Sequence, residues 1–234
     1  MGTADLFGEL YLRSTKPFLP TLLTVGEVAF LRERLPTGLV LDLGCGHGRH
    51  LQHLGPAAVG VDADPMSLRE AKAFGPVARA DFRSLPFRAG VFHGAYAWYN
   101  TLGTFEADEV SMVLVELGRC LGPGATLIVQ GTNPARARAA PEASFEGRLP
   151  DGSFLRETSR WVEAMGRDEV HRALTLTDGR VMAASFFIRY YELADWASVL
   201  GAAGLVVDWA CGGIDGSPVG VDSLDVIVGA HKRG

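Results

Sequence analysis

The sequence of 234 residues contains only three cysteines, and it lacks long apolar runs. Cys45, Cys120 and Cys211 are odd in number and have no paired spacing, which argues against a disulfide framework or a zinc knuckle. No stretch reaches the roughly 18 apolar residues of a membrane span, and the first ten residues lack the basic and apolar regions of a signal peptide. These absences predict a cytoplasmic protein with reduced thiols and no membrane contact.

Basic residues are also in deficit, because the formal net charge is −5. Proteins that bind nucleic acid usually carry a clustered basic face. The one thin cluster here, Arg136, Arg138 and Arg148, is interpreted as a solvated loop. Nucleic acid is therefore not an expected partner, and a small molecule is.

What is present is enough apolar material, 47% of the residues, for one sizeable core, so residues 1–234 are predicted to form a single domain. Short β-branched runs alternate with helical segments, which is typical of βα units feeding a parallel sheet. Asp64 is the expected cap of one helix, with Pro65 at its first position. The predicted strands are 39–43, 58–62, 76–80, 91–97, 125–130, 205–209 and 224–229, and the predicted helices are 48–54, 65–74, 106–121 and 193–203.

Two further segments interrupt this alternation. Residues 131–150 are rich in Ala, Arg and Pro and are predicted to be an irregular connection. Within a β insertion at 150–191, Asp178-Gly179 predicts a two-residue hairpin turn, which sets Leu174 opposite Ala183. Both this insertion and an N-terminal helical segment, 1–35, are expected to act as lids on the substrate side.

A glycine-rich loop follows the first predicted strand, with the sequence LDLGCGHGRH from Leu41 to His50. A dinucleotide-binding loop would carry a third glycine where this chain has Arg49, and Asp42 would repel a pyrophosphate. A metal site is disfavoured, because the histidines at 47, 50 and 53 drift around the helix. Cys45 is interpreted as a small residue under the ligand rather than a nucleophile.

Acidic residues follow the next two predicted strands, at Asp62 and Asp81. A carboxylate at the end of the second strand can accept hydrogen bonds from two ribose hydroxyls. Asp81, followed by Phe82, is placed to border an adenine. A ligand with a positive amino group, a sulfonium and no phosphate fits this pattern, and S-adenosylmethionine is such a ligand.

Three stretches in order, VLDLGCGHGRH, GVDADPMSLREA and ADFRSLPF, resemble the first motifs of the class I S-adenosylmethionine-dependent methyltransferases. WYNTLGTF, IRYYELADWASVLGAAGL and GIDGSP are similar to a small-molecule subgroup with a β insertion before the last helix. The resemblance implies an α/β fold, a Rossmann-like seven-stranded sheet with its last strand antiparallel, flanked by helices. It also implies cofactor contacts at Asp42, Gly44, Gly46, Asp62, Met66, Asp81, Phe82 and the backbone near Ala97.

Neighbouring residues complete the candidate site. Cys45 and Ala63 belong to the same two loops, and Arg49 is a candidate partner of the methionine carboxylate. No catalytic residue is assigned, although His93, Tyr99 and Tyr191 are weak candidates for a general base. The substrate-side candidates are Tyr11, Trp98, Tyr99, Asn100, Arg189 and Tyr191, and no metal is expected.

The predicted function is transfer of a methyl group from S-adenosylmethionine, leaving S-adenosylhomocysteine, to oxygen, nitrogen or carbon of a small molecule. A non-catalytic sensor of S-adenosylmethionine remains an alternative, because its cofactor pocket would look the same. An RNA or protein methyltransferase and a nicotinamide-dependent oxidoreductase are less favoured. The expected assembly is a monomer or a homodimer.

Overall fold

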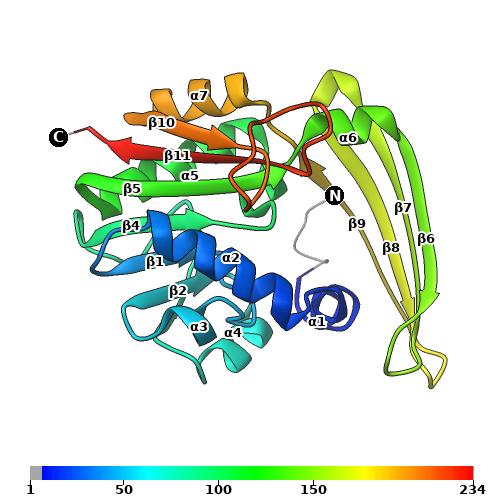
Figure 1. Cartoon of the computed structure of the whole chain (residues 1–234). Helices are drawn as coiled ribbons and strands as arrows, with labels where there is room; N and C mark the ends of the chain where they lie inside the picture. The colour runs from blue at the N-terminus through cyan, green and yellow to red at the C-terminus, as the bar shows by residue number, and fades with distance from the viewer. Residues whose placement is uncertain (1–6, 234) are drawn as a thin grey trace.

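The computed structural model describes residues 7–233, and its centre is a seven-stranded sheet in the order β10-β11-β5-β4-β1-β2-β3 (Figure 1). Strands β1 to β5 pair in parallel, and β11 runs antiparallel to both β5 and β10. This confirms the predicted sheet with its antiparallel last strand. The strands are β1 (Val40–Leu43), β2 (Ala58–Asp62), β3 (Val77–Arg79), β4 (Phe92–Ala97), β5 (Leu121–Thr132), β10 (Leu205–Cys211) and β11 (Asp225–Lys232).

Helices cover both faces of this sheet (Figure 1). Asp64 caps α4 as predicted, because its side chain accepts hydrogen bonds from the backbone N–H of Met66 and Ser67. The predicted helix at 48–54 is shorter than expected: its α-helical part begins at Leu51, since Gly48 has a φ of +83°. The α-helices flanking the sheet are α2 (Thr21–Arg34), α3 (Leu51–Leu54), α4 (Pro65–Ala71), α5 (Ala107–Cys120) and α7 (Leu193–Ala202).

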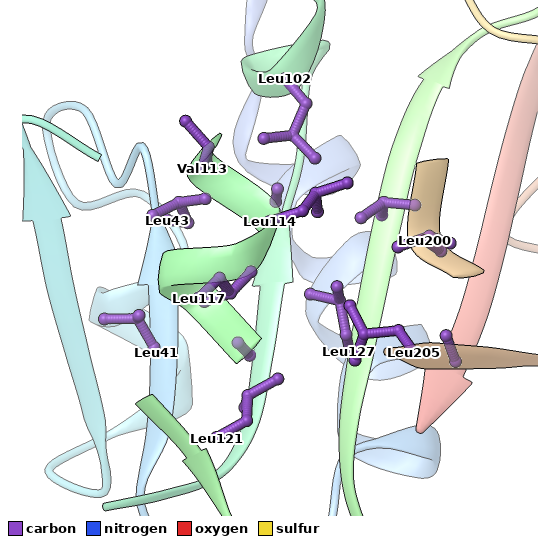
Figure 2. Close-up of a cluster of buried hydrophobic side chains, with 14 of the residues drawn as sticks. Leu41, Leu43, Leu102, Val113, Leu114, Leu117, Leu121, Leu127, Leu200 and Leu205 are labelled. Carbon is purple, nitrogen blue, oxygen red and sulfur yellow. The ribbon is translucent and has the colours of Figure 1, made fainter. Parts of the chain in front are cut away.

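The main core lies between the sheet and helices α5 and α7. Figure 2 shows leucines of β1, β5 and β10 pointing toward those of the two helices. Leu114 and Leu117 of α5 are fully buried there, as its apolar spacing predicts. On the opposite face, Phe30 and Leu31 of α2 pack against Tyr96 and Ile128. These two layers fix the carboxyl ends of the parallel strands at one edge of the domain.

The segment between β5 and α7 forms a separate four-stranded antiparallel sheet, in the order β6-β7-β8-β9. We call this sheet the insertion; it stands beside the main domain on the right of Figure 1. It starts at residue 142, so the prediction of an irregular connection over 131–150 was wrong. The elements are α6 (Pro134–Ala139), β6 (Glu142–Arg148), β7 (Phe154–Val162), the 3-10 turn η4 (Glu163–Met165), β8 (Arg167–Thr175) and β9 (Val181–Arg189).

The hairpin register of β8 and β9 also differs from the prediction. Leu176 N–H donates to the Arg180 carbonyl, so the loop has three residues, with Gly179 at a φ of +85°. One added loop residue shifts the register by one, and Leu174 lies opposite Met182 rather than Ala183. The apolar face of β9 is therefore formed by residues such as Ala184 and Phe186.

The N-terminal helical segment lies between the main domain and the insertion (Figure 1). It comprises α1 (Glu9–Ser14) and the 3-10 turn η2 (Lys16–Phe18), followed by α2. Leu10 of α1 packs into the apolar cluster on the insertion, with Leu155 and Leu174. Of the helices in the described residues 7–233, none is long and apolar enough to span a membrane.

Candidate cofactor and acceptor site

A cavity of about 810 Å³ opens at the carboxyl ends of the parallel strands, between the main sheet, α1 and the insertion. This is where open parallel sheets form binding crevices. Most predicted site residues meet in it. Those lining the cavity are Asp42, Gly44, Cys45, Gly46, Arg49, Asp62, Ala63, Asp81 and Phe82 on the predicted cofactor side, with Tyr11, Trp98, Tyr99 and Asn100 on the predicted substrate side.

The glycine loop forms one wall of the cavity. Gly44, Gly46 and Gly48 all have positive φ, a region that residues with a Cβ atom seldom adopt. A Cβ on Gly46 would meet no atom within 4 Å, so this backbone is bare toward the cavity. At Gly48, a Cβ would lie 2.8 Å from the Cα of Ala71, so the glycine allows α4 to approach closely. The loop can therefore place backbone against a ligand.

Asp62 connects this loop to the end of β2. Its Oδ2 accepts a hydrogen bond from Gly46 N–H at 2.8 Å, and its Oδ1 accepts one from Asp64 N–H at 2.9 Å. Burial raises the pKa of Asp62 above its usual value, and these backbone donors limit the rise. Each carboxylate oxygen keeps a further acceptor site for a ligand hydroxyl.

Asp42 and Asp81 stand at the ends of the neighbouring strands. Asp42 is almost fully buried, and this burial raises its pKa to about 7. Asp81 is half exposed, and hydrogen bonds from Arg83 hold its pKa below the usual value. Beside it, Phe82 is buried and packs on Phe105, with 5.8 Å between the ring centroids. Asp42, Asp62 and Asp81 thus line one cavity, with pKa values that are shifted in different directions.

Arg49 is held by a buried cluster that sequence reasoning missed. Its Nη1 donates to the Glu27 carboxylate and, at 3.2 Å, to the Thr24 hydroxyl. Glu27 also interacts with His50 Nε2 at 3.0 Å and accepts from Trp98 Nε1 at 2.9 Å. Burial alone would raise the pKa of Glu27, but its bonds to His50 and Arg49 lower it. Glu27 is therefore an ionised anchor beneath the cavity.

The second guanidinium nitrogen of Arg49, Nη2, is buried and has no hydrogen-bond partner among the described residues. An unpaired, buried N–H of a charged group is unfavourable by more than about 1–3 kcal/mol. Because Arg49 lines the cavity, an anionic ligand group could supply the missing acceptor. This orphaned donor is the clearest mark of a ligand in the structure.

Four predicted residues do not line the cavity. Met66 lies on α4 with its side chain more than one third exposed, and Ala97 is packed in the main core. Arg189 instead donates to the Met165 carbonyl at 2.5 Å and to Glu106 at 3.3 Å. Tyr191 is buried against Trp196, with 4.5 Å between the ring centroids. Contacts with other segments hold the side chains of Arg189 and Tyr191 away from the cavity.

None of the three suggested bases is suited to remove a proton. His93 lies near the amino end of β4, whereas the cavity lies at the carboxyl ends of the strands. Its Nδ1 accepts a hydrogen bond from Leu39 N–H at 3.2 Å. Burial raises the pKa of Tyr99, and it raises the pKa of Tyr191 to about 12, so both phenols stay protonated. Burial likewise raises the pKa of the Cys45 thiol, which packs close to Gly60. Within residues 7–233, His, Cys, Asp and Glu form no group of three that could hold a metal.

Tyr99 and Asn100 form a strained turn after β4, because both have a φ of +58° without being glycine. A side chain and a backbone N–H group of β5 hold this turn. Gln130 Oε1 accepts from Tyr99 N–H at 2.6 Å, and Asn100 Oδ1 accepts from Thr132 N–H at 2.7 Å. The turn brings Tyr99 and Asn100 to the edge of the cavity, and Tyr99 lies there opposite the insertion.

The insertion contributes polar residues that were not predicted. Glu157 of β7 and Arg172 of β8 line the cavity and form an ion pair at 2.5 Å. Arg172 also donates to the Thr15 hydroxyl at 2.6 Å, which ties α1 to the insertion. Both lie on the face that carries Leu155 and Leu174. Their charge on an otherwise apolar strand face was the sequence signal that could have identified them as site residues.

The chain is similar to known proteins in sequence and in fold. Residues 40–124 match a family model described as a methyltransferase domain. No curated protein sequence matches the chain.

Solved structures share the fold over the whole chain. The CcbJ methyltransferase of Streptomyces caelestis superposes with a TM-score of 0.79 at 20% identity, covering 100% of this chain and 97% of that one. A sugar N-methyltransferase, KedS8 of Streptoalloteichus, superposes with a TM-score of 0.67 at 20% identity, covering 97% of this chain and 94% of that one. CalS10 of Micromonospora echinaspora is an amino pentose methyltransferase whose structure has S-adenosylmethionine bound. It superposes with a TM-score of 0.66 at 15% identity, covering 97% of this chain and 98% of that one.

The chain therefore has the class I fold of the S-adenosylmethionine-dependent methyltransferases, which confirms the resemblance found in the sequence. Residues 40–124 within it match the methyltransferase-domain model, and the neighbour CalS10 is described with S-adenosylmethionine bound.

Proposed function

We propose that this chain transfers a methyl group from S-adenosylmethionine to an oxygen, nitrogen or carbon atom of a small polar molecule. The observation that carries the proposal is one cavity in which the glycine loop and three strand-end carboxyl groups face α1 and the insertion. Bound there, S-adenosylmethionine supplies an activated methyl group on a positively charged sulfur.

The residues on the strand side fit this cofactor. Asp62 offers acceptors for the ribose hydroxyls, and Asp81 with Phe82 borders the adenine. Asp42 offers a carboxylate to the positively charged part of the ligand. The free Nη2 of Arg49 offers a donor for the methionine carboxylate, a group that a nicotinamide dinucleotide lacks.

The opposite wall supports the small, polar character of the acceptor. Tyr11, Glu157 and Arg172 place hydroxyl and charged groups there, beside the apolar Phe186 and Ile188, and Tyr99 lies opposite the insertion. Glu157 Oε2 is taken by Arg172, whereas Oε1 accepts no hydrogen bond from a described side chain. An acceptor bearing hydroxyl or amino donors would use that oxygen, and a wholly apolar one would leave it desolvated.

Catalysis in this proposal is mainly positioning. The chain holds the acceptor atom in line with the transferable methyl group and excludes water from the gap between them. No residue is assigned as a general base. Acceptors that are already nucleophilic when neutral, such as amines, suit this arrangement better than those that must first lose a proton.

The test is turnover of labelled S-adenosylmethionine with a panel of small polar metabolites, including amines, polyols and hydroxylated rings. Release of S-adenosylhomocysteine that depends on an acceptor supports the proposal. Tight binding of S-adenosylmethionine without transfer to any member of a broad panel would instead support a sensor. Transfer to RNA or protein but not to small molecules would overturn the proposed acceptor class.

A further inference from the structure

The outermost strand of the insertion, β6, is an unpaired sheet edge. It pairs with β7 on one side only, and no element of residues 7–233 lies beyond it (Figure 1). Six of its seven residues are exposed, and the seventh, Gly147, is half-buried. A long open edge can pair with another strand, so proteins usually cover or disrupt it.

The hydrogen-bond pattern shows which residues of β6 face outward. Trp161 N–H donates to the Pro141 carbonyl at 2.7 Å, and Leu149 N–H donates to the Ser153 carbonyl at 2.8 Å. Hydrogen-bonded positions alternate along an antiparallel pair. The odd residues of β6 therefore pair with β7. The N–H and C=O groups of Glu142, Ser144, Glu146 and Arg148 point away from the sheet.

The side chains of β6 are complementary to a second, antiparallel copy of the same strand. With Phe145 on a two-fold axis, Glu142 faces the partner's Arg148, and Ser144 faces the partner's Glu146. This register pairs outward-facing positions with outward-facing positions, and it brings no like charges directly opposite. Moving the axis to residue 144 or 146 would set two glutamates against each other.

An exposed aromatic pair lies at the same place. Phe145 is 43% exposed, and it meets Phe18 of η2, which is 47% exposed, edge to face at 5.5 Å. Pairing about Phe145 would bring two such pairs together at the axis, where directly opposed side chains lie closest. An isologous contact of this kind closes on itself and needs no third copy.

We propose that β6 is a self-association edge, through which two copies of this chain join their insertions into one continuous eight-stranded antiparallel sheet. The contact involves one strand and one aromatic pair on each side, so the expected dimer is reversible and dependent on concentration. Charges usually protect an edge strand from pairing. Here their order along the strand favours a single antiparallel register.

The test is sedimentation velocity of the full chain between about 1 and 200 μM, a range that covers micromolar dissociation constants. Glu142→Arg and Arg148→Glu each place two like-charge pairs across the axis and should raise the dissociation constant about tenfold or more. The double reversal restores opposite charges and should recover dimerisation. Arg180→Glu, next to β9 at the opposite edge of the insertion, is a matched charge reversal and should leave it unchanged.

A second variant tests the backbone pairing. Ser144→Pro removes an outward N–H that has no partner in the monomer, so the fold should tolerate it while dimerisation is lost. Melting temperature serves as the control for folding. A wild-type chain that stays monomeric at every concentration overturns the proposal. So does a dimer that tolerates Ser144→Pro and both single reversals.

Discussion

At the residue scale, Asp62 connects the glycine loop to the proposed ribose site. Asp62→Ala should weaken binding of S-adenosylhomocysteine by about 1.5–3 kcal/mol, because hydrogen bonds to a charged group are lost. Isothermal titration calorimetry measures the effect, with the melting temperature as a control for the loss of the Gly46 contact. Unchanged affinity would show that Asp62 does not contact the ribose.

The carboxyl group of Asp42 makes cofactor binding sensitive to pH. Burial raises its pKa to about 7, so in the free protein it becomes charged only near neutrality. A carboxyl whose folded pKa lies above its unfolded one makes the fold less stable as pH rises from about 4 to 7. A positively charged ligand group needs the ionised form, so affinity should rise between about pH 6 and pH 8.

Calorimetry in buffers of different ionisation enthalpy measures this effect, because binding near pH 7 should release protons. His47 and His50 have their pKa lowered by burial to about 4, so they do not titrate in this range. Asp42→Asn should remove both the pH dependence and the proton release. A dependence that survives in this variant would belong to another group.

Arg49 is predicted to recognise only the amino-acid tail of the ligand. Arg49→Met removes the free Nη2 donor and should weaken the binding of S-adenosylhomocysteine by about 1.5–3 kcal/mol. Binding of 5′-methylthioadenosine, which lacks the tail, should be nearly unaffected and serves as the internal control. If both ligands weaken equally, Arg49 supports the fold of the pocket and does not contact the carboxylate.

At the scale of elements, the turn after β4 and the end of β9 are in unusually close contact. The 3-10 turn η3 (Thr101–Thr104) contains Gly103, and a Cβ there would lie 2.4 Å from the Arg189 carbonyl oxygen. The atom in the way belongs to the backbone of β9 and cannot rotate aside as a side chain can. Gly103→Ala should therefore push the insertion away from the cavity edge. We expect a loss of about 1–3 kcal/mol in the free energy of unfolding.

Gly201 of α7 offers a matched control, since a Cβ there meets nothing within 4 Å. Gly201→Ala should stabilise the chain by about 0.5–1 kcal/mol, because a helical glycine is entropically unfavourable. Chemical denaturation measures both variants. Similar effects at the two positions would mean that the contact between η3 and β9 is not tight in solution.

At the scale of the whole molecule, the site exists only because three parts of the chain close around it. The main sheet, α1 and the insertion each contribute lining residues. Arg172 joins two of them by donating to Ser14 and Thr15. A ligand that bridges these parts stabilises the complete fold over its unfolded state.

S-adenosylhomocysteine should therefore raise the melting temperature, whereas NADH should not. At about 100 times its dissociation constant, a ligand adds about 2.7 kcal/mol to the free energy of unfolding. For a chain of this length, that corresponds to a shift of roughly 5–10 °C. Differential scanning fluorimetry measures both ligands side by side. A shift with NADH alone would favour an oxidoreductase.

The sequence determined the parallel sheet and its cofactor edge. Apolar periodicity, the Asp64 cap and the glycine loop are local features, and strands that run parallel bring their carboxyl ends to one edge. Asp42, Asp62 and Asp81 could thus be placed together from their positions alone.

Only the tertiary structure decided which side chains complete the site. One extra residue in the β8–β9 loop changed the register of a whole hairpin, and no local rule predicted the pairing of Glu27 with Arg49 across 22 residues. Arg172 was brought to the cavity, and Tyr191 was turned away from it, by contacts between distant segments. Such choices depend on packing over the whole fold, because a side chain points where its strand register and its neighbours leave space.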